Sequence, residues 1–109
     1  MADFDVRLTR GAENDLEALY DYIQANHSTE QADALLDRIL VAVESLEGFA
    51  LRGSVPKELD ALGIREFRQT LVDPYRLIYR IVGKTAFVSV IADGRRDMQA
   101  LLERRLLGS

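Results

Sequence analysis

The chain has 109 residues, of which 48% are hydrophobic and 29% charged, and this length and composition predict one compact domain over residues 1–109. It has no cysteine and one histidine, which excludes a disulfide framework and argues against thiolate or multi-histidine metal centres, so we expect no metal and no cofactor. No apolar run is long enough to span a membrane, and residues 1–10 contain no signal-peptide core. These features predict a cytoplasmic protein without a membrane partner.

Charge is divided unevenly along the chain. The net charge is −4, but residues 1–50 hold three arginines against eleven acidic residues, about −8, whereas residues 51–109 hold eleven basic against seven acidic residues, about +4. Twelve of the fourteen cations are arginine, whose planar guanidinium suits carboxylate or phosphate recognition. The negative net charge argues against a protein that binds nucleic acids in general. The excess of basic residues in the second half, most of them arginine, predicts an anionic partner for that half.

The first half is predicted to form a short strand and two helices. Phe4–Leu8 alternates apolar and polar residues, as a half-buried strand does, and Thr9 can cap a helix that ends near Asn26. Ser28 opens a capping-box motif, S-T-E-Q, at the start of a second helix. Gly48 is expected to end that helix in the left-handed conformation. The pattern predicts a helix hairpin.

The second half changes to the period of strands. After a loop over Phe49–Gly63 with one short turn, strands are predicted over Ile64–Leu71, Tyr75–Val82 and Thr85–Ala92, joined by tight turns. A short helix follows residues 93–94. The predicted fold class is α+β, with an N-terminal strand, a two-helix hairpin packed on a small, mostly antiparallel sheet, and a short C-terminal helix.

The middle strand presents two different faces. Tyr75, Leu77 and Tyr79 alternate with Arg76 and Arg80, so the apolar side should pack on the helices. The other side then carries two arginines about 13 Å apart. No remaining long element is expected to cover this side, which predicts an open basic surface.

Several short motifs follow one another along nearly the whole chain. They are Leu8-Thr9 with Ala12-Glu13-x-Asp15-Leu16, Tyr20-Asp21-Tyr22-Ile23, Arg52-Gly53, Pro56-x-Glu58-Leu59, Tyr75-Arg76-x-Ile78-Tyr79-Arg80, and Asp93-Gly94-Arg95-Arg96-Asp97. In this order and spacing the chain resembles the RelE/ParE superfamily of toxins from bacterial type II toxin-antitoxin systems, in its ParE-like, plasmid-stabilisation branch. The resemblance implies a toxin that inhibits bacterial growth and is neutralised by a cognate antitoxin.

The two branches of this superfamily imply different activities. RelE-like members cut messenger RNA on the ribosome, whereas ParE-like members are associated with poisoning DNA gyrase and have no known reaction of their own. Cleavage of a phosphodiester needs a base, an acid and cations that stabilise charge on phosphorus. Cations are plentiful, and the candidates for target binding or toxicity are Arg65, Arg68, Arg76, Arg80, Arg95 and Arg96.

Groups that transfer protons are scarce. A guanidinium with a pKa above about 12 is a poor proton shuttle. RelE-type ribonucleases typically carry lysines on the sheet and a tyrosine or histidine near the C-terminus. The only lysines of this chain are Lys57 and Lys84, and no tyrosine or histidine follows Tyr79. Many relatives have a histidine where Asp93 stands. The sequence therefore favours a gyrase-binding toxin over an enzyme and predicts no catalytic residue; the alternative is a ribosome-dependent endoribonuclease whose acid-base groups come from water or ribosomal RNA.

The remaining polar candidates have simpler explanations. His27 is interpreted as a residue of the hairpin loop, and Asp93 and Asp97 as an ion-pair partner and a helix cap rather than metal ligands. Arg95 and Arg96 open a helix, where they either form an anion site or pair with those two aspartates. Tyr20, Tyr75 and Tyr79 fall on predicted core faces.

Antitoxin binding is expected to use an amphipathic antitoxin helix in an apolar groove and an extended segment along the sheet. The candidate antitoxin-binding residues are Leu101, Leu102, Leu106, Arg76 and Arg80. The leucines could equally serve a homodimer, so the free chain is open to a homodimer or a hetero-oligomer with the antitoxin. A third interpretation is a module that has lost toxicity and only binds an antitoxin.

Overall fold

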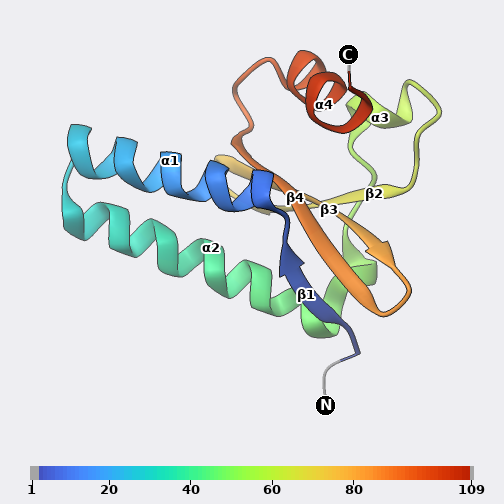
Figure 1. Cartoon of the computed structure of the whole chain (residues 1–109), viewed down its shortest axis with the longest axis horizontal. Coiled ribbons are helices and arrows are strands. Elements are labelled where there is room, and N and C mark those ends of the chain that lie inside the picture. Colours follow the sequence, from blue (N-terminus) through green and yellow to red (C-terminus); the bar gives the residue numbers. More distant parts are fainter. Residues whose placement is uncertain (1–2, 109) are drawn as a thin grey trace.

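A computed structural model describes residues 3–108, which form a four-stranded sheet with a helix hairpin on one face and two shorter helices on the other (Figure 1). The elements, in chain order, are β1 (Asp5–Leu8), α1 (Arg10–Asn26), α2 (Thr29–Phe49), the 3₁₀ turn η1 (Ala50–Arg52), α3 (Lys57–Asp60), β2 (Phe67–Val72), β3 (Tyr75–Val82), β4 (Thr85–Asp93) and α4 (Met98–Leu107). The predicted α+β class is confirmed. No helix among the described residues is long and apolar enough to cross a membrane.

The sheet is mostly antiparallel, as predicted. Its strand order is β1-β4-β3-β2, and only β1 runs parallel to its neighbour, from Asp5 opposite Thr85 to Leu8 opposite Val88. β4 continues to Asp93, so its last five residues extend beyond the end of β1. Helix α1, which follows β1, lies along this extension (Figure 1).

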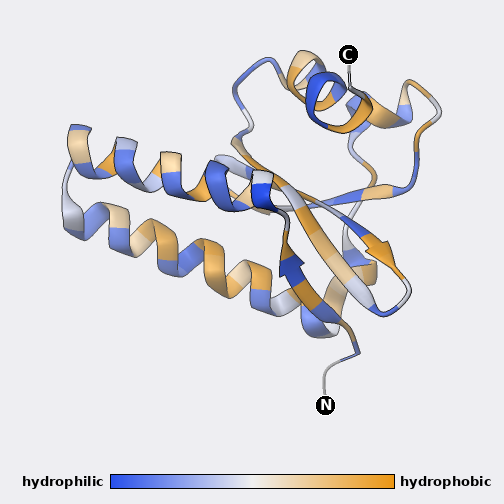
Figure 2. Ribbon diagram, in the orientation of Figure 1, coloured by the Kyte–Doolittle hydropathy of each residue, from blue (hydrophilic) through white to orange (hydrophobic). Residues whose placement is uncertain are grey.

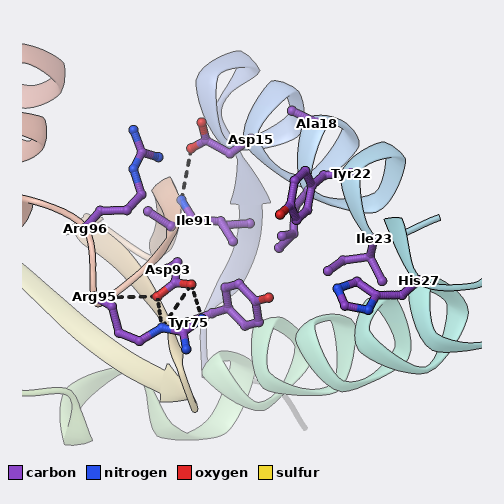
Figure 3. A pocket seen from close by; sticks show the side chains of 12 residues that line it. Asp15, Ala18, Tyr22, Ile23, His27, Tyr75, Ile91, Asp93, Arg95 and Arg96 are labelled. Carbon is purple, nitrogen blue, oxygen red and sulfur yellow. Dashed lines mark hydrogen bonds and ion pairs between the residues drawn. The ribbon is translucent and has the colours of Figure 1, made fainter. Parts of the chain in front are cut away.

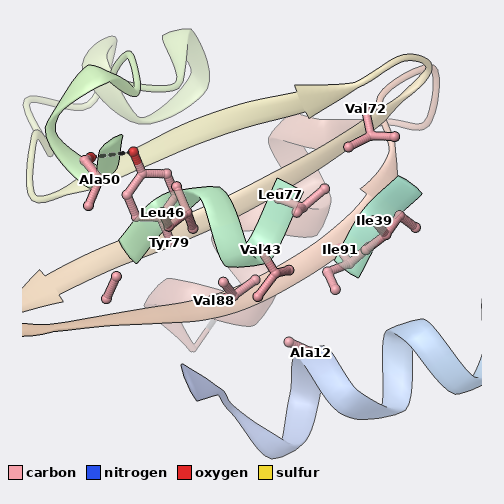
Figure 4. Close-up of a cluster of buried hydrophobic side chains, with 11 residues drawn as sticks. Ala12, Ile39, Val43, Leu46, Ala50, Val72, Leu77, Tyr79, Val88 and Ile91 are labelled. Atoms are coloured by element: carbon pink, nitrogen blue, oxygen red, sulfur yellow. Dashed lines mark hydrogen bonds between the residues drawn. The ribbon is translucent and has the colours of Figure 1, made fainter. Parts of the chain in front are cut away.

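Both hairpin helices begin at the predicted caps. The Thr9 hydroxyl accepts a hydrogen bond from the Ala12 N–H at 3.2 Å, and the Ser28 hydroxyl accepts one from the Gln31 N–H at 3.1 Å. Apolar residues recur along both helices and through the strands (Figure 2). The α2 side chains meet the sheet in a core that Figure 4 shows, made of Ile39, Val43, Leu46, Leu77, Tyr79, Val88 and their neighbours.

Two predicted boundaries are wrong. Helix α2 passes through Gly48 to Phe49 and continues into η1, because buried Ala50 is held by a hydrogen bond from the Tyr79 hydroxyl to its carbonyl. Gly48 does not have a positive φ. β2 begins at Phe67 rather than Ile64, since the Ile64 N–H bonds the Leu59 carbonyl and closes the turn after α3.

The expectation of an open arginine face is also wrong over much of the sheet. Met98, Leu101 and Leu102 of α4, with Leu59 of α3, pack on that face in a second core that includes Phe67, Ile78, Val90 and Ala92. Helix α4 has only ten residues, but these apolar side chains recur at helical spacing and cover the Asp93 end of the sheet. The sheet is therefore covered on both faces there.

Candidate functional site

A groove of about 560 Å³ lies where α1 passes the end of β4 (Figure 3). Tyr22 and His27 line it from the α1 side, Tyr75 from β3, and Arg95 and Arg96 from the segment that leads to α4. The groove exists because β4 extends beyond β1, so that a helix rather than a strand borders this edge.

Asp15 fixes α1 against the edge of β4. Its carboxylate accepts a hydrogen bond from the Ile91 N–H at 3.0 Å, in place of the strand that is missing there. The same carboxylate accepts two hydrogen bonds from Arg105 of α4, at 2.8 and 3.1 Å, and that guanidinium also donates to the Ser89 carbonyl. One ion pair thus joins α1, β4 and α4.

Asp93 and Arg95 form the polar floor of the groove. The guanidinium of Arg95 donates to both carboxylate oxygens of Asp93, the shortest bond being 2.6 Å, and the Arg95 N–H donates to the same side chain at 2.9 Å. These hydrogen bonds lower the pKa of Asp93 and raise that of Arg95. The Arg95 side chain is still 76% exposed, so its outer edge can meet a ligand.

Arg96 differs from its neighbour in having no ion pair among residues 3–108. Helix α4 begins at Met98, and Asp97 is its cap, accepting from the Ala100 N–H at 3.1 Å. Both arginines therefore precede the helix instead of lying in its first turn as predicted. The predicted pairing inside the chain is confirmed for Arg95 with Asp93, while Asp97 serves as the helix cap; Arg96 stays an exposed cation at the rim.

Arg76 is fully engaged inside the chain. Its guanidinium donates to both carboxylate oxygens of Glu58, at 2.8 and 2.9 Å, and to the Gln69 side chain. The side chains of Arg76 and Glu58 are only 12% and 10% exposed, and the hydrogen bonds from Arg76 lower the pKa of Glu58. Arg76 thus holds α3 on the sheet, and a partner protein could reach it only if this pair opened.

The other predicted arginines are scattered. Arg68 donates to the carbonyls of Leu51 and Gly53, which fastens the turn after α2 to β2. Arg65 forms an exposed ion pair with Asp60 at 3.3 Å. Arg80 is exposed and lies over the ring of Phe67, 5.9 Å from its centroid. The structure therefore brings only Arg95 and Arg96 together among the six candidates at this groove.

The leucines proposed for antitoxin binding are packed to different degrees. Leu101 and Leu102 are buried between α4 and the sheet, and Leu106 is half-buried beside them. An antitoxin could reach Leu101 and Leu102 only if α4 left the sheet. Leu106 is accessible without such a change.

The groove contains two residues, Tyr22 and His27, that the sequence does not single out as candidates for binding or catalysis. His27 caps the end of α1, with its N–H bonded to the Ile23 carbonyl, so its place in the hairpin loop is confirmed. Tyr22 is 59% exposed, in contrast to buried Tyr75 and Tyr79. In Figure 3, Tyr75 lies between His27 and the Arg95–Asp93 pair. No three histidine, aspartate or glutamate side chains among residues 3–108 gather to hold a metal ion.

A family model and a curated relative match this chain, and both are ParE toxins. Residues 6–98 match the family described as "ParE toxin of type II toxin-antitoxin system, parDE". The chain is 29% identical over 97 residues to Toxin ParE3 of Caulobacter vibrioides, covering 89% of this chain and 93% of that protein.

Two solved structures share the fold. A chain of the chromosomal ParDE toxin-antitoxin system from P. aeruginosa has a TM-score of 0.69 at 24% identity, covering 84% of this chain and 96% of that one. A chain of the toxin-antitoxin complex RelBE2 from Mycobacterium tuberculosis has a TM-score of 0.57 at 25% identity, covering 85% and 93%. The chain belongs to the ParE toxin family of type II toxin-antitoxin systems.

Proposed function

We propose that this toxin inhibits bacterial growth by binding DNA gyrase in the cytoplasm, with the Arg95–Arg96 end of the groove at the contact, and that a cognate antitoxin neutralises it. The observation that carries the proposal is the contrast between arginines. Arg76 is saturated by Glu58 and Gln69, whereas Arg96 and the outer edge of Arg95 face solvent beside an open groove. Guanidinium groups arranged in this way suit recognition of carboxylates on a protein surface.

The same contacts argue against phosphodiester cleavage as the main activity. A guanidinium stabilises charge on phosphorus best when its donors are free to turn to the transition state. Arg76 has its donors directed at Glu58 and Gln69, and Arg95 has two of its nitrogens directed at Asp93. Docking needs no proton transfer, and the donors that stay free on Arg96 and on the outer edge of Arg95 suffice for contacts with carboxylates.

One observation favours the alternative, a ribosome-dependent endoribonuclease. His27, Tyr22 and Tyr75 line the same groove as Arg95 and Arg96, and an imidazole ring can both accept and donate a hydrogen bond. In this alternative His27 would exchange protons with the message while Arg96 faces its phosphate. His27→Gln should then abolish message cleavage, whereas gyrase inhibition should not depend on this residue.

Antitoxin binding is supported by the relatives. The P. aeruginosa and Mycobacterium tuberculosis chains come from systems described as toxin-antitoxin pairs. A protein antitoxin is therefore the expected partner of this chain, and competition between antitoxin and gyrase for one surface would explain neutralisation. Plasmid stabilisation, the role after which the branch that this chain resembles is named, is part of the same proposal.

The test compares purified toxin on gyrase and on translating ribosomes. We expect inhibition of supercoiling and intact message, and the Arg95→Ala, Arg96→Ala double variant should lose both gyrase inhibition and growth arrest while its melting temperature stays close to wild type. Lys84→Ala with Arg104→Ala removes two other exposed cations and is the matched control, expected to stay toxic. Message cut at defined codon positions, with gyrase unaffected, would establish the alternative instead.

A further inference from the structure

The strand register places two arginines and two phenylalanines in one row across all four strands. Arg7 is paired with Phe87, Phe87 with Arg80, and Arg80 with Phe67. Directly paired residues project from the same face of a sheet. Since neighbouring Ala86, Val88 and Tyr79 face the helix hairpin, the row lies on the opposite face, where α4 packs.

Helix α4 covers the Asp93 end of this face and leaves the row partly open. A groove of about 440 Å³ lies between the row and the end of α4, lined by Phe67, Arg80, Phe87 and, from α4, Leu106. Arg7 and Arg80 are exposed and Phe87 is half-buried, whereas Phe67 is buried under the Arg80 guanidinium. A flat ligand can therefore reach one aromatic face with a cation on either side.

The charge of this groove differs from that of the whole chain. No acidic residue lines it, although the chain has a net charge of −4, and neither Arg7 nor Arg80 has an ion pair among residues 3–108. Arg65, Arg76, Arg95 and Arg105 are all paired with carboxylates. Asp5 lies two residues before Arg7 on the same face of β1 but forms no ion pair with it, so both arginines of the row can pair with an anionic ligand.

We propose that this row binds a short segment of single-stranded nucleic acid, with a base stacked on Phe87 and its flanking phosphates on Arg7 and Arg80. Arg7 and Arg80 are two strand spacings apart, about 10 Å between backbones, which leaves room for one stacked base between two phosphate contacts. Aromatic faces alternating with cations form the pattern by which sheets bind single strands without sequence preference. An acidic peptide would match the arginines but leave the aromatic face between them unused.

This surface lies at the end of the sheet away from Arg95 and Arg96, because Phe87 is near the start of β4 and Asp93 at its end. The inference therefore does not depend on whether gyrase is the target. It adds a nucleic-acid contact to a toxin whose proposed action is protein binding, and it assigns that contact to one row of the sheet.

The test is fluorescence anisotropy with a labelled oligothymidylate of about twelve nucleotides in about 50 mM salt. We expect saturable binding by the wild-type chain, and at least ten-fold weaker binding of an abasic oligomer of equal length, because the stacked base is missing. Phe87→Leu should weaken binding about five-fold or more and Phe87→Tyr should restore it. Arg7→Gln and Arg80→Gln should each reduce the slope of log affinity against log salt by about 0.7.

Arg65→Gln is the matched control, since it removes one exposed cation outside the row and should change affinity by less than about two-fold. Thermal unfolding of each variant shows that it is folded, and the abasic comparison tests stacking on the wild-type chain alone. Three results would overturn the proposal: no saturable binding up to about 100 µM, equal affinity for the abasic oligomer, or equal losses in Arg65→Gln and Arg80→Gln. Row variants that impair only antitoxin binding would assign the surface to a protein.

Discussion

Glu58 and Arg76 illustrate how one residue pair fixes a surface that the sequence alone left open. Removing one partner of a largely buried ion pair leaves an uncompensated charge in place, which costs about 3 kcal/mol. We therefore expect Glu58→Gln to lower the free energy of unfolding by about 3 kcal/mol in urea denaturation at pH 7. Loss of the α3 contact should accompany it, because this pair ties α3 to β3.

Asp60→Asn is the control on the same short helix, since Asp60 pairs with Arg65 in solvent and should change stability by less than about 1 kcal/mol. The pH dependence gives a second check. Arg76 lowers the pKa of Glu58 in the folded chain below the ordinary value of 4.5, so the ionised carboxylate stabilises the fold above that pH. The gap between wild type and Glu58→Gln should shrink as pH falls below about 4.5, and a constant gap would contradict this account.

At the scale of elements, the position of α4 depends on Arg105 reaching past Gly11. A Cβ on Gly11 would lie 2.6 Å from an Arg105 nitrogen, so alanine there must push the guanidinium away from Asp15. In the wild-type chain Gly11→Ala should therefore lower stability. In an Arg105→Met background the same change should raise stability by about 0.5 kcal/mol, since alanine is the better helix residue.

A double-mutant cycle of these two changes, measured by thermal or urea unfolding, isolates the coupling. The expected sign reversal is the decisive result. Equal effects of Gly11→Ala in both backgrounds would show that Arg105 does not need the space beside Gly11. Hydrogen exchange of α4 amides would report whether the helix loosens when the contact is removed.

Elements whose signals are local were predictable, and contacts between distant segments were not. The caps at Thr9 and Ser28 and the alternation of β3 involve residues close in sequence, and the structure confirms them. The end of α2 depends on Tyr79, 29 residues away from Ala50. No local sequence pattern reveals that contact. The local signal at Gly48 predicts a helix end there, because glycine often ends helices in the left-handed conformation.

The site divides in the same way. Pairing of Arg95 with Asp93 spans two residues and was foreseeable, whereas Arg76 with Glu58 spans 18 and the Asp15 contact to β4 spans 76. Arg76 is buried by its pairing with Glu58 of α3, and α4, although it has only ten residues, covers the strands on the same face. Position in space, which the sequence did not supply, separates the arginines that can meet a partner from those that hold the fold.

At the scale of the whole molecule, Glu47 and the Arg95–Arg96 pair lie near opposite ends of β4. The described chain extends 39 × 37 × 22 Å. The Glu47 carbonyl at the end of α2 accepts hydrogen bonds from the Asp3 and Phe4 N–H groups, just before β1 pairs with the start of β4. Asp93, at the other end of β4, lies eight residues from Thr85, which corresponds to roughly 26 Å along the strand. This separation exceeds the screening length of about 8 Å at physiological salt.

Binding to a polyanion should therefore follow the local basic surface rather than the net charge. We expect the chain to be retained on a heparin matrix at low salt although its net charge is −4. Arg95→Gln with Arg96→Gln should lower the salt concentration needed for elution, because it removes two exposed cations that a sulfate group could contact. Glu44→Gln with Glu47→Gln changes the net charge by the same amount in the opposite direction, far from those arginines, and should leave elution nearly unchanged. If the salt concentration at elution instead shifts by equal and opposite amounts in the two variants, the net charge of the molecule governs its binding to heparin. The two arginines would then contribute only through that net charge.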